Sequence, residues 1–259
     1  MSINKGFVNE NEFIEYFNGK SFVELNENFN NFILFLTNND IPNEKFLCEK
    51  GKGGQKPDVV LKVGNKKFFI SLKVGSGNSV HQEMFSEFLL FLDSIGLSKN
   101  GLDLLKEFHY ADGTLNDTGV ERLSSVEFCK KFPEKVFLLN KELNKKEIKK
   151  SILNRVLFQG KSESYDKAEF IYHGTIEKGY WAKSTEIINI DTPIKNNCVH
   201  VGNLTYQPWG RDQDFNAVHP NRRYVSQFKF GSCEKVLKQI RGNSNDKSRD
   251  ERRRYSRNK

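Results

Sequence analysis

The segment from Lys56 to Lys73 constrains the fold of this chain more than any other part of its sequence. Apolar and polar residues alternate on both sides of Gly64-Asn65, a dipeptide typical of two-residue hairpin turns. The pattern predicts two antiparallel strands, over residues 58–63 and 66–74. If Gly64 and Asn65 form the loop, the numbers of paired residues sum to 129, and Asp58 lies opposite Ser71.

The two faces of this predicted hairpin differ in chemistry. One face carries polar side chains, because Lys73 lies two residues beyond Ser71 and points to the same side as Ser71 and Asp58. The opposite face is apolar, and its burial would fix the register. The apolar residues are Val59, Leu61, Val63, Ile70, Leu72 and Val74. The sequence therefore predicts that an acid, a hydroxyl and an amine converge on one face.

The rest of the chain predicts helices before and after this hairpin and more strands towards the carboxyl end. Capping boxes are indicated at Ser21 with Glu24 and at Ser79 with Gln82. The predicted helices are 8–17, 21–37, 79–94, most of 98–157 and a short helix that ends at Ile240; the other predicted strands are 45–50, 168–173, 198–201 and 223–230.

This order of elements predicts an α/β fold, with a central mixed β-sheet flanked by helices and a helical insertion. We expect one domain over residues 1–240, with a core at 21–95, the insertion at about 98–157 and a β-rich half at about 165–240. Residues 241–259 carry eight basic and three acidic side chains, which is most of the net charge of +8. This tail is expected to be disordered, either as a solvated end or as an arm that follows phosphates.

The composition of the 259 residues excludes several classes of protein. The longest apolar runs have five residues, far fewer than the roughly 20 of a membrane helix, and the amino terminus lacks the hydrophobic stretch of a signal peptide. The cysteines Cys48, Cys129, Cys198 and Cys233 form no CxxC pair, so neither a zinc knuckle nor a disulfide framework is indicated. These features predict a cytoplasmic protein with reduced thiols.

The Asp58 strand followed by Ser71-Leu72-Lys73 resembles the PD-D/ExK nuclease superfamily, which places an Asp on one strand and D/E-x-K on the next. Ser71 stands where the family has an acid. A subgroup of type II restriction endonucleases has S-x-K and takes the missing acid from the following helix. The resemblance implies that Glu83, or else Glu87, supplies it, since both fall on one face of the predicted helix.

The resemblance implies a restriction-endonuclease-like core and a magnesium-dependent endodeoxyribonuclease, a type II restriction enzyme that acts on double-stranded DNA. It also implies a homodimer, and a separate cognate methyltransferase that protects the host DNA. Digestion to a smear would instead indicate a defence or repair nuclease without sequence specificity. A third possibility is a non-catalytic nucleic-acid-binding protein that uses the basic tail and residues 141–155.

Mg²⁺, or Mn²⁺ in its place, prefers oxygen ligands and lowers the pKa of an attacking water. Lys73 would orient or help to deprotonate that water and offset the charge on the phosphate. The predicted catalytic residues are Asp58, Ser71, Lys73, Glu83 and Gln82, and the predicted metal ligands are Asp58, the Leu72 carbonyl, Glu83 and Glu87. The resemblance implies one further ligand from the first helices, for which Glu24 is the candidate.

Arg and Gln side chains in the carboxyl half are expected to read DNA, because Arg pairs with guanine and Gln with adenine in the major groove. The predicted DNA-binding residues are Gln55, Lys56, Trp209, Arg211, Arg222, Arg223, Gln227 and Lys229. The alternative for the carboxyl group is a structural strand with a Trp anchor. Gln227-x-Lys229 after Asp214 is also compatible with a degenerate second copy of the nuclease pattern.

Other interpretations of the same residues are weaker. Asp58 after a proline is compatible with a turn, Lys73 with a solvated lysine, and Glu83 with an ordinary helix face. A serine hydrolase usually pairs Ser and Lys as S-x-x-K on a helix, which differs from Ser71-x-Lys73 on a strand. A ββα-metal nuclease built on His200, Asn216 and His219 lacks the matching hairpin.

Overall fold

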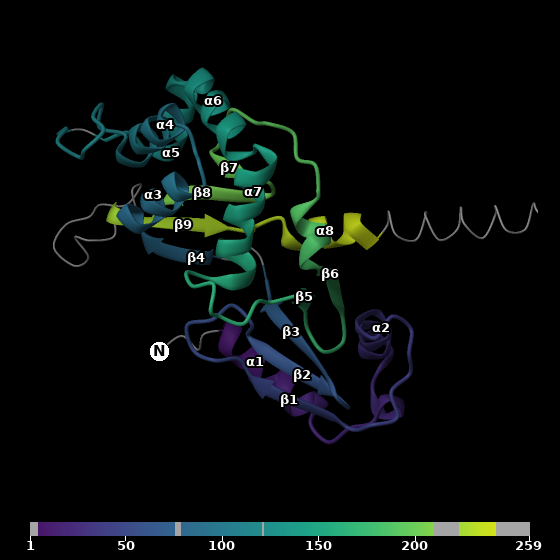
Figure 1. Cartoon of the computed structure of the whole chain (residues 1–259). Helices are drawn as coiled ribbons and strands as arrows, with labels where there is room; N and C mark the ends of the chain where they lie inside the picture. The colour runs from purple at the N-terminus through teal and green to yellow at the C-terminus, as the bar shows by residue number, and fades with distance from the viewer. Residues whose placement is uncertain (1–4, 76–78, 121, 210–222, 242–259) are drawn as a thin grey trace, which may run out of the picture. The chain divides into compact units, whose positions relative to one another are not determined.

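A computed structural model describes residues 5–75, 79–120, 122–209 and 223–241 (Figure 1). Their Cα positions divide into two compact units. Unit 1 comprises the described residues of 1–76, 158–189 and 232–259, and unit 2 those of 77–157 and 190–231. The mixed α/β architecture predicted from the sequence is confirmed, with helices and a sheet in each unit. No helix among the described residues is long and apolar enough to span a membrane.

Unit 1 is built on a five-stranded sheet in the order β1-β2-β3-β5-β6. The sheet is mixed, because β3 pairs with β5 in parallel while the other neighbours are antiparallel. The elements are α1 (Lys5–Phe17), the 3₁₀ turn η1 (Phe22–Glu24), α2 (Glu27–Leu36), β1 (Phe46–Lys50), β2 (Val59–Val63), β3 (Lys66–Lys73), β5 (Phe170–Gly174), β6 (Gly179–Lys183), α8 (Ser184–Ile188) and a helix over 233–241.

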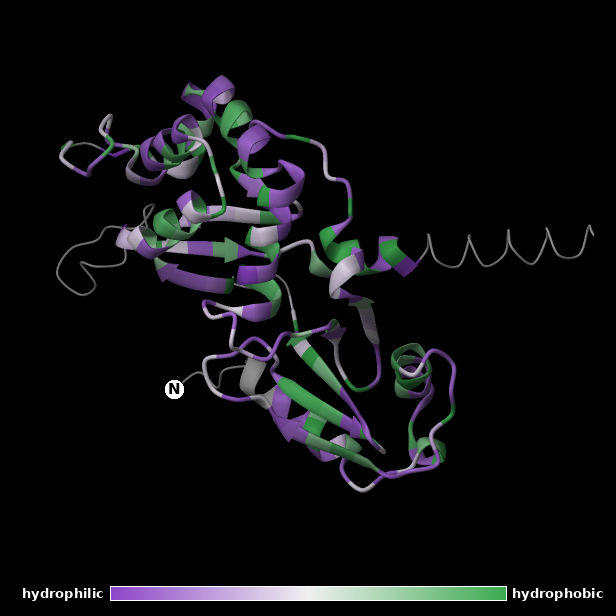
Figure 2. Ribbon diagram, in the orientation of Figure 1, coloured by the Kyte–Doolittle hydropathy of each residue, from purple (hydrophilic) through white to green (hydrophobic). Residues whose placement is uncertain are grey.

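The β2–β3 hairpin has the predicted register. Val59 pairs with Ile70 and Val63 with Lys66, so paired numbers sum to 129. Gly64 adopts a φ of 56°, which a two-residue loop of this type needs and which glycine adopts without strain. Val59, Leu61 and Ile70 are fully buried, and Figure 2 shows β2 and β3 largely in the hydrophobic colour. The apolar face thus holds the register that places Asp58 opposite Ser71.

The core of unit 1 is an aromatic cluster between this apolar face and helices α1 and α2. Phe13, Phe17, Phe29 and Phe32 are almost completely buried and pack with Tyr172 of β5. The Phe29 and Tyr172 rings stack with centroids 5.6 Å apart, and other pairs meet edge to face. Large aromatic side chains contribute much of the burial energy of a core, so this cluster anchors the sheet that carries the predicted site.

Unit 2 has a four-stranded antiparallel sheet in the order β4-β9-β8-β7. Helices α3 and α4 pack on the face that holds Tyr206 and Phe228, through Phe88 and Phe108. The elements are β4 (Ser79–Met84), α3 (Phe85–Ser94), α4 (Lys99–Tyr110), α5 (Ser125–Lys131), α6 (Pro133–Leu143), α7 (Lys146–Leu153), β7 (His200–Val201), β8 (Leu204–Pro208) and β9 (Val225–Lys229). A π-helical turn, η2 (Asn154–Gln159), runs from unit 2 into unit 1.

Two predicted helices are wrong in part. Residues 79–84 form strand β4, and the helix begins only at Phe85. His81 and Glu83 are buried while Gln82 and Met84 are exposed, which is the alternation of a strand paired with β9. The predicted helix over 21–37 is a 3₁₀ turn followed by α2, because Asn26 caps a new helix through the Phe29 N–H. The strands β6 and β8 were not predicted.

Candidate active site and nucleic-acid interface

Asp58 lies directly before β2, where the 51–57 loop joins the strand. The Gly51 N–H donates a hydrogen bond to the Asp58 carbonyl at 2.9 Å, and the Asp58 N–H donates to the Ile70 carbonyl at 2.9 Å. A Cβ on Gly51 would lie 1.8 Å from the Pro57 carbonyl oxygen, so only glycine permits this approach. The backbone of Asp58 is therefore fixed from both neighbouring strands.

The Asp58 carboxylate is the centre of a polar cluster. Its Oδ2 accepts hydrogen bonds from the Ser71 hydroxyl at 3.0 Å, the Leu72 N–H at 2.6 Å and the Lys73 ammonium at 3.3 Å. Lys73 Nζ also donates to Ser71 Oγ at 2.7 Å and to the Leu72 carbonyl at 2.9 Å. The three predicted side chains therefore converge on one face of the hairpin. Asp58 and Lys73 stay partly exposed, at 25% and 17% of their side chains.

The oxygen atoms of this cluster suit a hard divalent cation. The three hydrogen bonds described above go to Asp58 Oδ2, and Oδ1 is the oxygen of this carboxylate that could bind a cation. Mg²⁺ usually keeps several waters and needs only one or two carboxylates together with substrate phosphates. Within the described part of the chain no three His, Cys, Asp or Glu side chains cluster as a metal site. Asp58 Oδ1 and the Leu72 carbonyl are the oxygen atoms of the cluster that could hold such an ion, with waters and a phosphate in its other positions.

Two neighbours of Lys73 were not predicted. His173 of β5 pairs with Lys73 in parallel register, lies on the same face and donates to the Gly75 carbonyl at 3.0 Å. Burial raises the pKa of the Cys233 thiol to about 12, although the Lys73 charge acts in the opposite direction. The 168–173 strand was predicted, but nothing local in the sequence shows that it pairs with the Lys73 strand.

Glu83 has a different environment from the predicted one. It lies on β4 in unit 2, so it does not share a helix face with Glu87. Its side chain is completely buried and accepts two hydrogen bonds from Arg155, at 3.1 Å from Nε and 2.7 Å from Nη2. His81 Nε2 contacts the same carboxylate at 2.8 Å. Glu83 is thus the acid of a buried, bidentate ion pair that ties β4 to η2.

The ion pair gives unit 2 a pH-dependent stability. Burial alone would raise the Glu83 pKa, but hydrogen bonds from His81 and Arg155 outweigh it and lower the pKa to about 2 from 4.5. A lowered carboxyl pKa stabilises the fold above pH 4.5, and this contribution is lost as the pH falls from about 4.5 to 2. The shift corresponds to about 3 kcal/mol.

We expect urea unfolding to show this loss. The difference in unfolding free energy between the wild type and Glu83→Gln should shrink as the pH is lowered from 5 towards about 2, because a protonated Glu83 resembles glutamine. A constant difference over that range would contradict the assignment.

Each of the other residues predicted as ligands or catalytic groups has its own local surroundings. Glu24 is exposed and accepts the Ser21 N–H and hydroxyl at 2.7 and 2.6 Å, and these bonds lower its pKa. Glu87 is exposed on α3, and its role stays a prediction. Gln82 is exposed on β4 and donates to Ser79 Oγ at 3.2 Å.

Gln82 belongs to a row of three glutamines across the sheet of unit 2. It pairs in register with Gln227 of β9, which pairs with Gln207 of β8. Gln207 Nε2 donates to Gln227 Oε1 at 2.6 Å, and Gln227 Nε2 donates to Ser79 Oγ at 3.1 Å. Lys229 and Thr205 pair in the next row. This face is opposite to the one that α3 and α4 cover. Gln207 was missed because β8 was not predicted.

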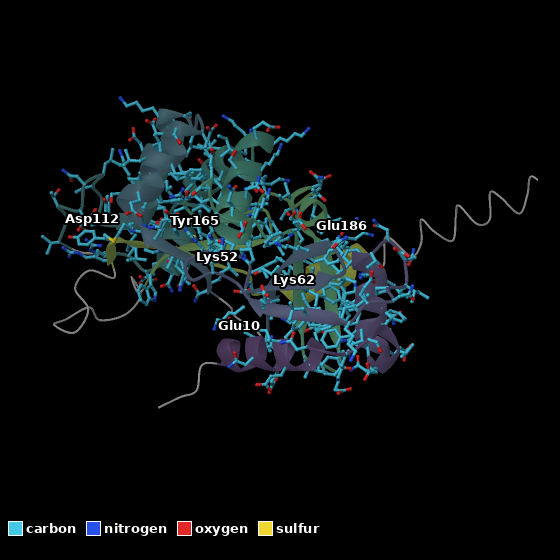
Figure 3. All side chains as sticks on the ribbon, turned by 60° about the horizontal axis from the view of Figure 1, so that its bottom comes forward. Glu10, Lys52, Lys62, Asp112, Tyr165 and Glu186 are labelled. Atoms are coloured by element: carbon cyan, nitrogen blue, oxygen red, sulfur yellow. The ribbon has the colours of Figure 1, made fainter. Side chains whose placement is uncertain are left out.

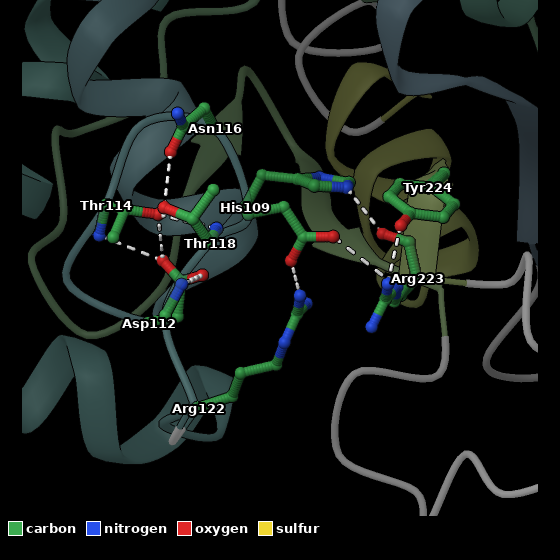
Figure 4. A network of polar contacts seen from close by, with 10 residues as sticks. His109, Asp112, Thr114, Asn116, Thr118, Arg122, Arg223 and Tyr224 are labelled. Atoms are coloured by element: carbon green, nitrogen blue, oxygen red, sulfur yellow. Dashed lines mark hydrogen bonds and ion pairs between the residues drawn. The ribbon is translucent and has the colours of Figure 1, made fainter.

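Of the remaining carboxyl-half residues predicted to contact DNA, Arg223 and Trp209 have contacts within unit 2, and the others lie outside the described residues. Arg223 pairs with the buried Asp117 at 3.4 Å, and Arg122 contacts the same carboxylate (Figure 4). The Arg223 guanidinium also donates to Tyr224 Oη at 2.6 Å, so part of its charge is used within unit 2. Trp209 continues β8 through its N–H, which donates to the Val225 carbonyl. Arg211 and Arg222 lie outside the described residues, as do Asp214, Asn216, His219 and residues 242–259.

The remaining residues that the sequence analysis discussed have local contacts within the fold. Gln55 Oε1 accepts the Asp166 N–H at 3.3 Å, and Lys56 is half-buried in the same loop. His200 is buried and contacts the Gly202 carbonyl at 3.0 Å, as a core histidine does. The four cysteines are free thiols, of which Cys198 is half-buried and the others are buried.

Comparison with known proteins relates the chain to one class of fold. No family model matches the sequence, and no curated protein does. Among solved structures, the crystal structure of restriction endonuclease MspI in complex with its cognate DNA matches with a TM-score of 0.56 and 12% identity. The match covers 86% of this chain and 88% of that one. The chain therefore has a restriction-endonuclease-like fold.

Proposed function

We propose that this protein is a magnesium-dependent endodeoxyribonuclease of the type II restriction class, which hydrolyses phosphodiesters of double-stranded DNA. The convergence of Asp58, Ser71 and Lys73 on one hairpin face carries the proposal. The likeness to a restriction endonuclease supports it through the fold, over most of both chains. The carboxylate, the carbonyl and the ammonium provide cation binding and charge compensation, the two requirements of metal-assisted phosphodiester cleavage.

Each residue of the cluster has a role that follows from its contacts. Asp58 and the Leu72 carbonyl would hold the divalent ion, which when bound polarises the phosphate and lowers the pKa of a water. Lys73 would move its ammonium group from the Leu72 carbonyl to a phosphate oxygen and offset the charge that develops there. Ser71 holds both Asp58 and Lys73, so it positions them. Glu83 is assigned no ligand role here, because its carboxylate is bound by Arg155.

We also propose that the glutamine row of unit 2 reads base edges. Amides that are linked to one another are oriented before binding, and glutamine pairs bidentately with adenine in the major groove. Gln82 is exposed and Gln207 half-buried, so these two would reach the base edges when the sheet face lies in the groove. Gln227 is buried between them, and its amide is bonded to Gln207 and Ser79. Lys229 in the adjacent row would bind a phosphate.

Replacing the exposed Gln82 by Ala should change specificity more than affinity. We expect about a 5- to 150-fold loss on preferred sites and little change on other DNA, because one bidentate base contact is worth roughly 1–3 kcal/mol. Lys229→Gln is the matched comparison and should weaken binding to all sequences alike. Selection of bound fragments from a random DNA pool measures both effects. An unchanged fragment preference in Gln82→Ala would exclude base reading by this row.

Incubation of the purified protein with plasmid DNA tests the function. We expect cleavage with Mg²⁺ and none with EDTA, and discrete fragments rather than a smear. A smear would indicate a nuclease without sequence specificity. Tight, salt-sensitive binding without any cleavage would favour a non-catalytic DNA-binding protein.

A further inference from the structure

A hollow of about 340 Å³ lies beside the polar cluster in unit 1. Its floor is Val60 and Phe69, which pair with each other across β2 and β3. Asp58 and Ser71 are the next residues along the same face of these strands, two positions further on. Two residues of a strand span about 6.6 Å, so the hollow and the cluster are neighbouring parts of one surface.

The hollow is rich in lysine. Lys50, Lys52, Lys62 and Lys67 line it, with Gln55 and the acids Glu49 and Asp166. We call this set of lysines the lysine groove; Figure 3 labels Lys52 and Lys62. Lys62 pairs with Glu49 at 2.6 Å and Lys52 with Asp166 at 3.5 Å. Lys67 is exposed, and no carboxylate among the described residues pairs with it.

The carboxylates that pair with Lys52 and Lys62 can be replaced by a phosphate at low cost, because both pairs are partly exposed to solvent. The Lys52 and Asp166 side chains are 76% and 43% exposed, and the Glu49 carboxylate that pairs with Lys62 is half exposed. Exposed pairs of this kind contribute at most about 1 kcal/mol. A phosphate that approaches the groove can therefore replace the carboxylates at low cost, and it gains the charge of the unpaired Lys67. The half-buried floor offers apolar contact to a sugar.

We propose that the lysine groove binds the phosphates of the DNA strand next to the phosphodiester at the Asp58–Lys73 cluster. This inference rests on the proposed function, because it takes the cluster as the position of the cut. The groove would hold the strand by charge and by sugar contacts, without reading bases. Lys62 and Lys67, which face each other across β2 and β3, are its central cations.

Binding of a fluorescent DNA duplex in EDTA, at several salt concentrations, tests the groove without requiring cleavage. The logarithm of the association constant falls linearly with the logarithm of the salt concentration. In the Lys62→Gln/Lys67→Gln double variant this negative slope should become shallower by about 2 than in the wild type, because each lysine contributes about one released counterion. Lys62→Arg/Lys67→Arg should restore the slope. Lys66→Gln is the matched control: Lys66 neighbours Lys67, points to the other face and pairs with Asp40 at 3.8 Å.

Three results would contradict the proposal that the groove binds phosphates. They are an unchanged salt slope in the double variant, an equal change of slope in the Lys66 control, and a wild-type protein that does not bind DNA. Cleavage by the wild type in Mg²⁺, measured separately, decides the proposed function. Binding that depends on the groove, without cleavage, would contradict the nuclease function and support the phosphate-binding groove. Cleavage by the wild type, with an unchanged salt slope in the double variant, would support the nuclease function and contradict the groove.

Discussion

Asp58→Asn and Lys73→Met should each lower the rate of DNA cleavage by about 10³-fold or more, measured under single-turnover conditions in Mg²⁺. Asp58 supplies the only carboxylate of the cluster, and Asn keeps its shape and hydrogen bonds while it removes the charge. Lys73 carries the ammonium group that would offset charge on the phosphate. Met keeps most of the length of the lysine side chain but cannot donate a hydrogen bond.

Both variants should still fold and bind DNA. Asp58 and Lys73 are partly exposed, and their ion pair of 3.3 Å is one of several contacts that hold the hairpin together. Ser71→Ala should have a smaller effect than either, because Ser71 acts through its neighbours. Full cleavage activity in Asp58→Asn or in Lys73→Met would exclude this cluster as the active site.

Arg155→Leu should destabilise unit 2 by about 3–5 kcal/mol, because it leaves the fully buried Glu83 carboxylate without its bidentate partner. Arg155 also stacks on Phe91, with its guanidinium carbon 4.4 Å from the ring centroid. Urea unfolding monitored by circular dichroism at pH 7 gives the change. Lys150→Leu is the comparison: Lys150 forms a 4.0 Å pair with Glu147 on the exposed face of α7, and its loss should cost less than about 1 kcal/mol.

The double variant Arg155→Leu/Glu83→Leu separates this mechanism from a simple packing defect. A buried ion pair can often be replaced by apolar side chains at little cost, because desolvation opposes its attraction. We expect the double variant to recover most of the stability that Arg155→Leu loses. Equal loss in the single and the double variant would show that the uncompensated charge is not the cause.

The convergence of the polar cluster could be predicted from the sequence because its geometry is local. A two-residue loop sets the register of a hairpin, and the burial of Val59, Leu61 and Ile70 excludes a shift by one residue. Asp58, Ser71 and Lys73 then have to share a face. The restriction-endonuclease-like fold that the family resemblance implied agrees with the likeness to a solved restriction endonuclease.

The surroundings of Glu83 could not be predicted in the same way. The segment Ser79–Met84 is a six-residue strand that runs directly into a helix, and short segments of this kind fit both periodicities. Its strand partner is β9, and the Arg155 that binds Glu83 is 72 residues away. The pairing of His173 with Lys73 and the alignment of Gln82, Gln227 and Gln207 could not be predicted for the same reason, because these residues are far apart in the sequence.

The binding of Mn²⁺ tests the central proposal most directly, because Asp58 is assigned as the carboxylate that holds the divalent ion. Electron paramagnetic resonance follows free Mn²⁺ during titration of the protein in the presence of DNA and does not depend on turnover. We predict that the wild type binds Mn²⁺ and that Asp58→Asn loses most of this affinity. Equal Mn²⁺ affinity in the two proteins would contradict the account.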